Sequence, residues 1–282
     1  MAHSELGGAN GWGLSSSFVT HLRSEHPELV HGLFDAAAVR ALAAAQAPEA
    51  APGAHGTTVL AMRFDRGVVM AGDRRATEGF TIASRGIEKV FPADSHSAVA
   101  IAGAAGPAVE MVRLFQVELE HYEKIEGRRL SLEGKANRLA EMIRQNLMAA
   151  LQLGLAVVPI FCGFDLGRGV GRIFKYDLAG GRYEERDFHS TGSGGRDARS
   201  YVKGRWHEGM TEDAAVGVAL EALFEASDED AGTGGPDVLR RIYPNIAVID
   251  ADGYRVVPED EVARIFDDVL EDLRARYGGE RS

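Results

Sequence analysis

Apolar and polar positions follow two repeating patterns from residue 57 onward. Alternating or fully apolar runs predict strands over 57–64, 67–73, 79–84, 96–103, 155–165, 171–178, 182–188, 245–250 and 254–257. Apolar residues three and four positions apart predict helices around 108–122, 131–147, 211–223 and 262–273. Strands, paired helices, strands and then helices are typical of helices packed on antiparallel sheets, so we expect an α+β fold.

Local signals set several element boundaries. The segment Asp65-Arg66-Gly67 is typical of a tight turn, so 57–64 and 67–73 are expected to pair as a hairpin. Ser131 and Thr211 are expected to cap the second and third helices, because their hydroxyl oxygens can accept from free backbone N–H groups. Nothing in the pattern divides 57–282, which we expect to form one domain.

The stretch 147–164 is nearly free of polar residues and superficially resembles a membrane span. Gln152, Gly154 and Pro159 interrupt it, and its first half continues a helical period that begins upstream. We therefore expect the end of a buried helix that runs into a buried strand, and no association with a membrane.

The first 56 residues differ in texture from the rest. They are rich in Ala, Gly, Ser and Pro and end in AQAPEAAPGAHG, which is typical of a loosely ordered extension with an accessible linker. The chain start has no basic segment followed by an apolar one, so we expect no secretory signal.

Composition narrows the classes of function. The 31 basic and 42 acidic side chains give a net charge of −11, which disfavours nucleic acid as the main partner. The single cysteine, Cys162, excludes an internal disulfide framework and a thiolate zinc cluster, and it fits a cytoplasmic protein. Its apolar surroundings predict a small core residue.

Three residues that can carry chemistry are regularly spaced. Thr57 follows Gly56 at the start of the first strand, Asp73 ends the partner strand, and Lys89 comes as far beyond Asp73 as Asp73 lies beyond Thr57 (73 − 57 = 89 − 73 = 16). If Lys89 lies one strand further along, the hydroxyl, carboxylate and amine converge at one sheet end. A surface Asp–Lys pair beside a strand threonine fits the same spacing.

That trio suits one kind of reaction. A threonine hydroxyl is a poor nucleophile without an adjacent base. Cleavage between Gly56 and Thr57 would give Thr57 its own α-amine, a base with an ordinary pKa of about 7.7–8.0. A nearby Lys89 cation would lower the pKa of that amine, and Asp73 would hold Lys89 charged and oriented.

These residues belong to a set of motifs that resembles the β subunits of the proteasome, specifically the actinobacterial kind. The resemblance covers essentially all of 57–282 and rests on Thr57 after glycine, GDRRAT around Asp73, IEKVF with Lys89, AIAGAAGPA, TGSGG at 191–195 and DAGTGGPD at 230–237. It implies the N-terminal-nucleophile hydrolase fold, a four-layer α-β-β-α sandwich of two antiparallel sheets between helix layers.

The resemblance also implies roles for individual residues. Thr57 would be nucleophile and base, with Asp73 and Lys89 in support. Gly103 matches the family's oxyanion-hole glycine, Ser193 the serine beside the α-amine, and Asp230 a supporting aspartate. Thr233 stands where the family often has serine. Taken singly, Gly103 also fits a tight turn, TGSGG a loop that needs positive φ angles, and Asp230 a solvated carboxylate.

Substrate preference follows from the matching pocket positions. None of them is charged, so we expect cleavage mainly after apolar or aromatic residues; they are Ala76, Ile87, Phe91, Ile101, Ala105 and Val109.

The resemblance implies a threonine endopeptidase made as an inactive precursor. Residues 1–56 would be a propeptide, removed by autocatalytic cleavage between Gly56 and Thr57, and 57–282 the catalytic domain. The implied partners are α subunits and other β subunits in stacked heptameric rings, a ring ATPase, and substrates tagged with a prokaryotic ubiquitin-like modifier. No metal or organic cofactor is needed. The alternatives are an HslV-type peptidase and a ring subunit without catalytic activity.

Overall fold

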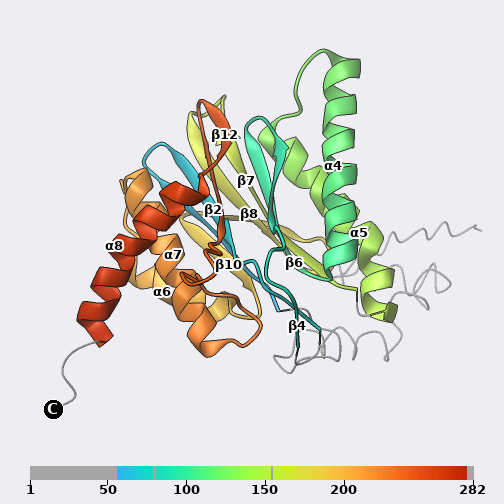
Figure 1. Ribbon diagram of the computed structural model, residues 1–282. Helices are drawn as coiled ribbons and strands as arrows, with labels where there is room; N and C mark the ends of the chain where they lie inside the picture. The colour runs from blue at the N-terminus through green and yellow to red at the C-terminus, as the bar shows by residue number, and fades with distance from the viewer. Residues whose placement is uncertain (1–55, 79–80, 154, 278–282) are drawn as a thin grey trace, which may run out of the picture. The chain divides into compact units, whose positions relative to one another are not determined.

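Residues 56–78, 81–153 and 155–277 are described by a computed structural model (Figure 1). The propeptide predicted over 1–56 lies outside these residues, apart from Gly56. Within the described part, the strands form two five-stranded antiparallel sheets and one two-stranded ribbon.

The first sheet contains the predicted hairpin. Strands β1 and β2 pair with Val59 opposite Gly72 and Phe64 opposite Gly67, so the turn lies at the expected place. The spatial order is β10-β1-β2-β11-β12. The strands are β1 (Thr58–Phe64), β2 (Gly67–Gly72), β10 (Phe188–Gly192), β11 (Asn245–Asp250) and β12 (Gly253–Val256).

The second sheet is a meander in chain order, and a short ribbon precedes it. The sheet contains β5 (Val90–Asp94), β6 (Ser97–Gly103), β7 (Val157–Asp165), β8 (Val170–Tyr176) and β9 (Arg182–Glu185). The ribbon pairs β3 (Ala76–Glu78) with β4 (Thr81–Ser84).

One prediction about the strands was wrong. The segment 182–188 is not one strand, because the chain leaves the second sheet after Glu185 and enters the first sheet at Phe188. The neighbour of β2 on its other side is β11. Strand β5 was not predicted.

Helices cover the outer face of each sheet. Helices α4 (Ala105–Glu126) and α5 (Leu132–Leu153) pack on the second sheet around Phe115, Phe161 and Phe174. The first sheet is covered by α6 (Gly195–Arg205), α7 (Glu212–Glu229) and α8 (Glu259–Tyr277). Figure 1 shows the two helix groups on opposite sides of the strands. The four-layer α-β-β-α arrangement is therefore confirmed.

The expected capping residues occupy their places. The Thr211 hydroxyl accepts from Ala214 N at the start of α7, and the Ser131 hydroxyl accepts from Gly134 N at the start of α5. Helix α6 was not predicted.

A third apolar cluster fills the space between the two sheets. Val59, Met70, Ile160 and Cys162 contribute to it and are fully buried. Cys162 is thus a core residue, as predicted, and burial raises the pKa of its thiol. The stretch 147–164 spans the end of α5 and most of β7, as predicted. The helix end is not buried as expected, however, because Met148 is exposed and Leu147 and Leu151 are only half-buried. None of the helices in the described part of the chain combines the length and apolarity needed to cross a membrane.

Candidate active site

Thr57 lies immediately before β1, at one end of the sheet sandwich. Its side chain is largely buried, with 5% of the residue exposed. The chain is continuous from Gly56, so the Thr57 nitrogen is here a peptide amide. The Thr57 hydroxyl donates to the Gly56 carbonyl oxygen at 2.8 Å. The hydroxyl therefore already lies beside the carbonyl group of the bond that precedes it.

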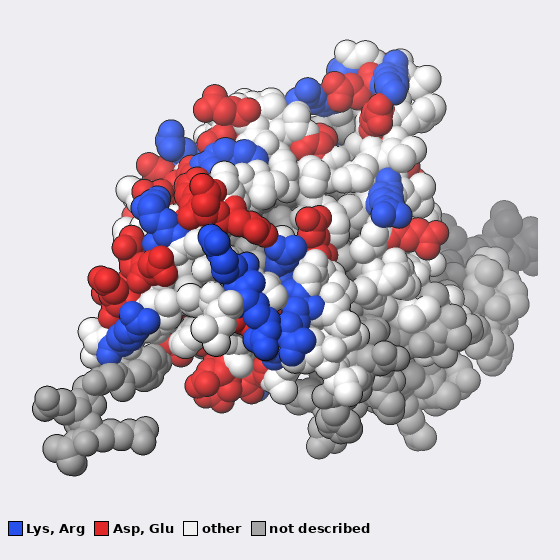
Figure 2. Space-filling view, in the orientation of Figure 1, with Lys and Arg blue, Asp and Glu red and all other residues white. Residues whose placement is uncertain are grey.

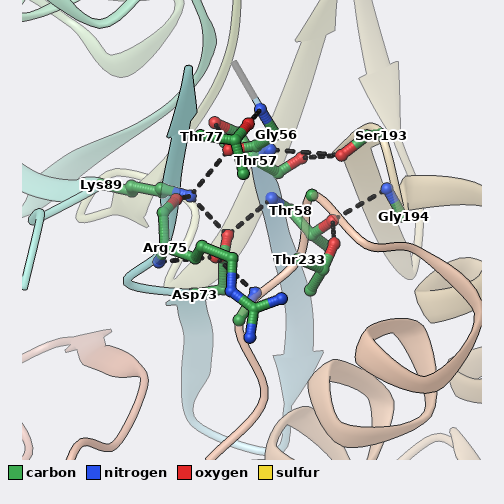
Figure 3. A network of polar contacts seen from close by, with 12 residues as sticks. Gly56, Thr57, Thr58, Asp73, Arg75, Thr77, Lys89, Ser193, Gly194 and Thr233 are labelled. Carbon is green, nitrogen blue, oxygen red and sulfur yellow. Dashed lines mark hydrogen bonds and ion pairs between the residues drawn. The ribbon is translucent and has the colours of Figure 1, made fainter. Parts of the chain in front are cut away.

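Asp73 and Lys89 form a buried ion pair next to that peptide (Figure 3). Lys89 Nζ lies 2.6 Å from Asp73 Oδ1, 2.6 Å from the Arg75 carbonyl oxygen and 3.4 Å from the Gly56 carbonyl oxygen. The Asp73 carboxylate also accepts three backbone N–H groups, from Thr58 at 2.7 Å and from Arg75 and Gly234 at 2.9 Å each. Because the Lys89 ammonium and the Asp73 carboxylate both have their hydrogen-bonding partners, the pair is held rigidly in place. It is therefore not the surface Asp–Lys pair that the sequence spacing also allowed.

The environment of Lys89 changes its acidity. Burial lowers the pKa of the Lys89 ammonium below its ordinary value, and the Asp73 carboxylate opposes that shift. The ammonium is aimed at the Gly56 carbonyl oxygen, which also accepts the Thr57 hydroxyl. A cation at this position polarises the carbonyl and stabilises negative charge on its oxygen.

Lys89 reaches the site by a different route from the one predicted. It does not lie one strand further along the first sheet; it directly precedes β5, in the second sheet. Its carbonyl oxygen accepts from Ile101 N on β6, and its own N–H donates to Asn245 Oδ1 at the start of β11. The convergence of Thr57, Asp73 and Lys89 is therefore correct, but it joins the two sheets.

Ser193, Asp230 and Thr233 gather on the opposite side of Thr57. Thr57 N donates to Ser193 Oγ at 3.2 Å, and the Ser193 hydroxyl donates to Asp230 Oδ2 at 2.5 Å. The Thr233 hydroxyl donates to the same oxygen at 2.6 Å. The structure thus brings all three residues together, and the threonine at 233 supplies the hydroxyl expected of it.

The TGSGG loop depends on two of its glycines for different reasons. Gly192 has φ +101, and a Cβ there would lie 1.8 Å from the Thr57 carbonyl oxygen. Gly194 lacks a positive φ, but its Cβ would lie 2.6 Å from Thr233 Oγ1. Because both allow close approach, the loop can bring Ser193 N within 2.8 Å of the Thr57 carbonyl oxygen.

Gly103 ends β6, two residues before the first residue of α4. Its φ is +104, and a Cβ there would lie 2.2 Å from the Ala156 carbonyl oxygen. Ile101, two residues before Gly103, donates its N–H to the Lys89 carbonyl oxygen. Gly103 thus combines the tight turn that the sequence allowed with a place at the same sheet end as Lys89, one residue before the α4 N-cap.

The predicted pocket residues fall into two groups. Phe91, Ile101 and Val109 pack in the apolar cluster between the second sheet and α4, and Ala105 begins that helix. The other two, Ala76 and Ile87, lie close in sequence to Asp73 and Lys89. Ile87 is held there by donating its N–H to the Arg74 carbonyl oxygen.

A cavity of about 340 Å³ adjoins the site from outside. Arg74, Arg75 and Arg85 line it together with Gly234 and other residues of the segment after α7. On the face shown in Figure 2, acidic and basic side chains are otherwise intermixed, with one group of Lys and Arg near its centre. Arg75 and Gly234 both donate N–H groups to Asp73, so the wall of this cavity is continuous with the buried ion pair.

Sequence reasoning missed three contributors. Thr58 N donates to Asp73, and the Thr58 hydroxyl contacts Thr233. The Thr77 hydroxyl accepts from Gly56 N at 2.8 Å, and the Gly232 backbone abuts Gly56. The sequence offered one signal for Thr58: its hydroxyl follows that of Thr57 at the start of a strand predicted to be buried, and a buried hydroxyl requires a hydrogen-bonding partner.

The sequence of the chain is similar to those of known proteins. A family model described as proteasome subunit matches residues 54–240. Over 225 residues the chain is 61% identical to a protein named proteasome subunit beta from Acidimicrobium ferrooxidans, covering 79% of this chain and 82% of that protein. It is 52% identical over 268 residues to a protein of the same name from Acidothermus cellulolyticus, covering 94% and 89%.

Proposed function

The chain belongs to the proteasome subunit family, and we propose that it is a catalytic β subunit acting as a threonine endopeptidase. One observation carries the proposal: the Gly56 carbonyl oxygen lies between the Thr57 hydroxyl and the Lys89 ammonium, while Asp73 holds that ammonium. A nucleophile, an electrophile and a cation are thereby assembled in a buried site, where electrostatic stabilisation is strong.

Maturation is proposed to start from this arrangement. Thr57 Oγ1 attacks the Gly56 carbonyl carbon, the Gly56–Thr57 C–N bond breaks, and the hydroxyl proton ends on the released Thr57 amine. Water then hydrolyses the resulting ester, which frees residues 1–56 with a Gly56 carboxylate and restores the hydroxyl. Lys89 stabilises the negative charge that develops on the carbonyl oxygen during the attack.

The same residues serve peptide hydrolysis after maturation. The Thr57 amine accepts the hydroxyl proton, directly or through water, and Thr57 Oγ1 attacks the substrate carbonyl. Gly103 contributes a backbone N–H near the start of α4 to the oxyanion. Ser193, backed by Asp230 and Thr233, holds the amine in place. Hydrolysis of the acyl-enzyme by water completes the cycle.

The specificity pocket is proposed to be apolar. Ala76, Ile87, Phe91, Ile101, Ala105 and Val109 carry no charge, so they favour apolar or aromatic side chains before the cleaved bond.

Membership of this family implies assembly with other proteasome subunits in rings. We propose α subunits and further β subunits in stacked heptameric rings as the immediate partners. A ring ATPase in the cytoplasm would supply substrates tagged with a prokaryotic ubiquitin-like modifier.

Two other functions are less well supported. A ring subunit without catalytic activity is disfavoured because such a subunit has no need for a buried lysine beside Thr57 whose ammonium is paired with a carboxylate. An HslV-type peptidase is disfavoured because the relatives reported above are named proteasome subunit beta.

The test is a comparison of wild type with Thr57→Ala, each co-produced with the α partner. We expect wild-type particles to lose residues 1–56 and to hydrolyse fluorogenic peptides. Thr57→Ala particles should retain the extension and be inactive, because the nucleophile is absent. Cleavage after Gly56 in assembled Thr57→Ala particles would contradict the proposed mechanism.

A further inference from the structure

We propose that Thr58, the residue after the nucleophile, is a positioning residue whose hydroxyl fixes Ser193 and Asp230 relative to Thr57. This inference rests on the proposed function. Thr58 is fully buried. Its N–H donates to Asp73 Oδ1 at 2.7 Å and its carbonyl oxygen accepts from Asp73 N at 3.0 Å, so its backbone is tied to the ion pair. Its side chain serves the other half of the site.

The hydroxyl of Thr58 has two partners, which Figure 3 shows. Thr58 Oγ1 accepts from Gly194 N at 3.0 Å and lies 2.6 Å from Thr233 Oγ1. Thr233 has one hydroxyl proton, and that proton is donated to Asp230 Oδ2, because a carboxylate can only accept. The Thr58 hydroxyl must therefore be the donor to Thr233. Both the proton and an acceptor site of Thr58 are in use.

These hydrogen bonds link Thr58 to Thr57 through side chains that all donate toward Asp230. Thr58 donates to Thr233, which donates to Asp230. The Ser193 hydroxyl also donates to Asp230, which leaves a lone pair of Ser193 to accept from Thr57 N. The start of β1, the TGSGG loop and the segment after α7 are thereby locked to one another.

Loss of the Thr58 hydroxyl would act at two points of this set of hydrogen bonds. Gly194 N–H, which is buried, would lose its acceptor, and the loop that carries Ser193 would lose an anchor. The Thr233 hydroxyl would lose the donor that orients it toward Asp230. The hydroxyl of Thr58 is bonded to neither Thr57 Oγ1 nor the Gly56 carbonyl oxygen among the hydrogen bonds of the described residues, so its effect is on position.

The experiment compares two variants in assembled full-length particles made with the α partner. Thr58→Val keeps the branched shape and removes the hydroxyl; Thr58→Ser keeps the hydroxyl and removes the methyl group. Both retain the backbone contacts with Asp73. Peptide hydrolysis is measured as kcat and KM per active site, with sites counted by a peptide epoxyketone. Thr57→Ala is run alongside.

We expect Thr58→Val to lower kcat about tenfold, with KM and the kcat of Thr58→Ser within about twofold of wild type. If Thr57→Ala is inactive, as the proposed function requires, two results would overturn the inference. One is a wild-type kcat in Thr58→Val, and the other is an equal loss of kcat in Thr58→Val and Thr58→Ser. Activity in Thr57→Ala would instead refute the proposed function, and this inference with it. If Thr58→Val fails to assemble, Thr233→Val removes the acceptor of the same bond, and wild-type kcat there would overturn the inference.

Discussion

Gly56→Ala should slow maturation sharply, because Gly56 is packed against another backbone. A Cβ at position 56 would lie 2.2 Å from Gly232 Cα and 2.4 Å from the Gly232 carbonyl oxygen, whereas ordinary contact begins near 3.4 Å. The two segments must therefore separate by about 1.2 Å (3.4 − 2.2), and neither can yield by rotating a side chain. Close approach to the Gly232 backbone is therefore the reason that position 56 requires a glycine.

That displacement moves the carbonyl carbon that Thr57 attacks. A misplacement of about 1 Å costs roughly a hundredfold in rate, so we expect processing of Gly56→Ala to be about a hundred times slower than that of wild type. The fold should survive, since such overpacking costs typically about 1–3 kcal/mol.

The assay follows subunit mass over time after the purified full-length chain is mixed with α subunits. Gly204→Ala in α6 is the matched control, because a Cβ there meets nothing within 4 Å and should leave processing unchanged. Processing of Gly56→Ala at a rate within about threefold of wild type would refute the reasoning.

Three further outcomes are expected. Asp73→Asn leaves the Lys89 ammonium buried without its counter-charge, so the free energy of unfolding in urea should fall by about 3–5 kcal/mol; a change below about 1 kcal/mol would be contradictory. Burial lowers the pKa of His189 from 6.5 to about 4, so the unfolded chain takes up this proton first as the pH falls and stability is lost between pH 6.5 and 4. Between pH 7 and pH 5 the free energy of unfolding of His189→Gln should therefore fall by about 2 kcal/mol less than that of wild type. Equal losses in the two proteins would argue against a lowered pKa of His189. Fluorogenic peptides with an apolar residue before the cleaved bond should be hydrolysed at least about tenfold faster than peptides with a charged one; a profile dominated by acidic or basic residues would exclude the apolar pocket.

Elements with a strong local pattern could be predicted from the sequence. The β1–β2 hairpin has a turn signal, and α7 has both a capping threonine and an apolar period. The residues that α6 buries, Gly195, Ala198 and Val202, do lie at helical spacing, but two of them are small and charged residues surround them, so the apolar signal is weak. The exchange between sheets after Glu185 was missed for a similar reason, since no glycine or proline marks it.

The site was predictable where residue chemistry limits the possibilities, and less so where tertiary structure decides. Thr57, Asp73 and Lys89 meet as expected, but their equal spacing suggested one sheet, and only the crossing to β5 places Lys89 correctly. The contact of Thr58 with Thr233 joins residues 175 positions apart, and no local pattern reveals it.

The central claim is that Thr57, freed at its nitrogen, is the nucleophile. Mass spectrometry of assembled particles treated with a peptide epoxyketone tests it directly, because the warhead reacts with a hydroxyl and the adjacent α-amine of one residue. We expect a subunit that begins at Thr57 and carries a ring adduct on that residue. An assembled particle that has lost residues 1–56 but forms no adduct on Thr57 would contradict the account.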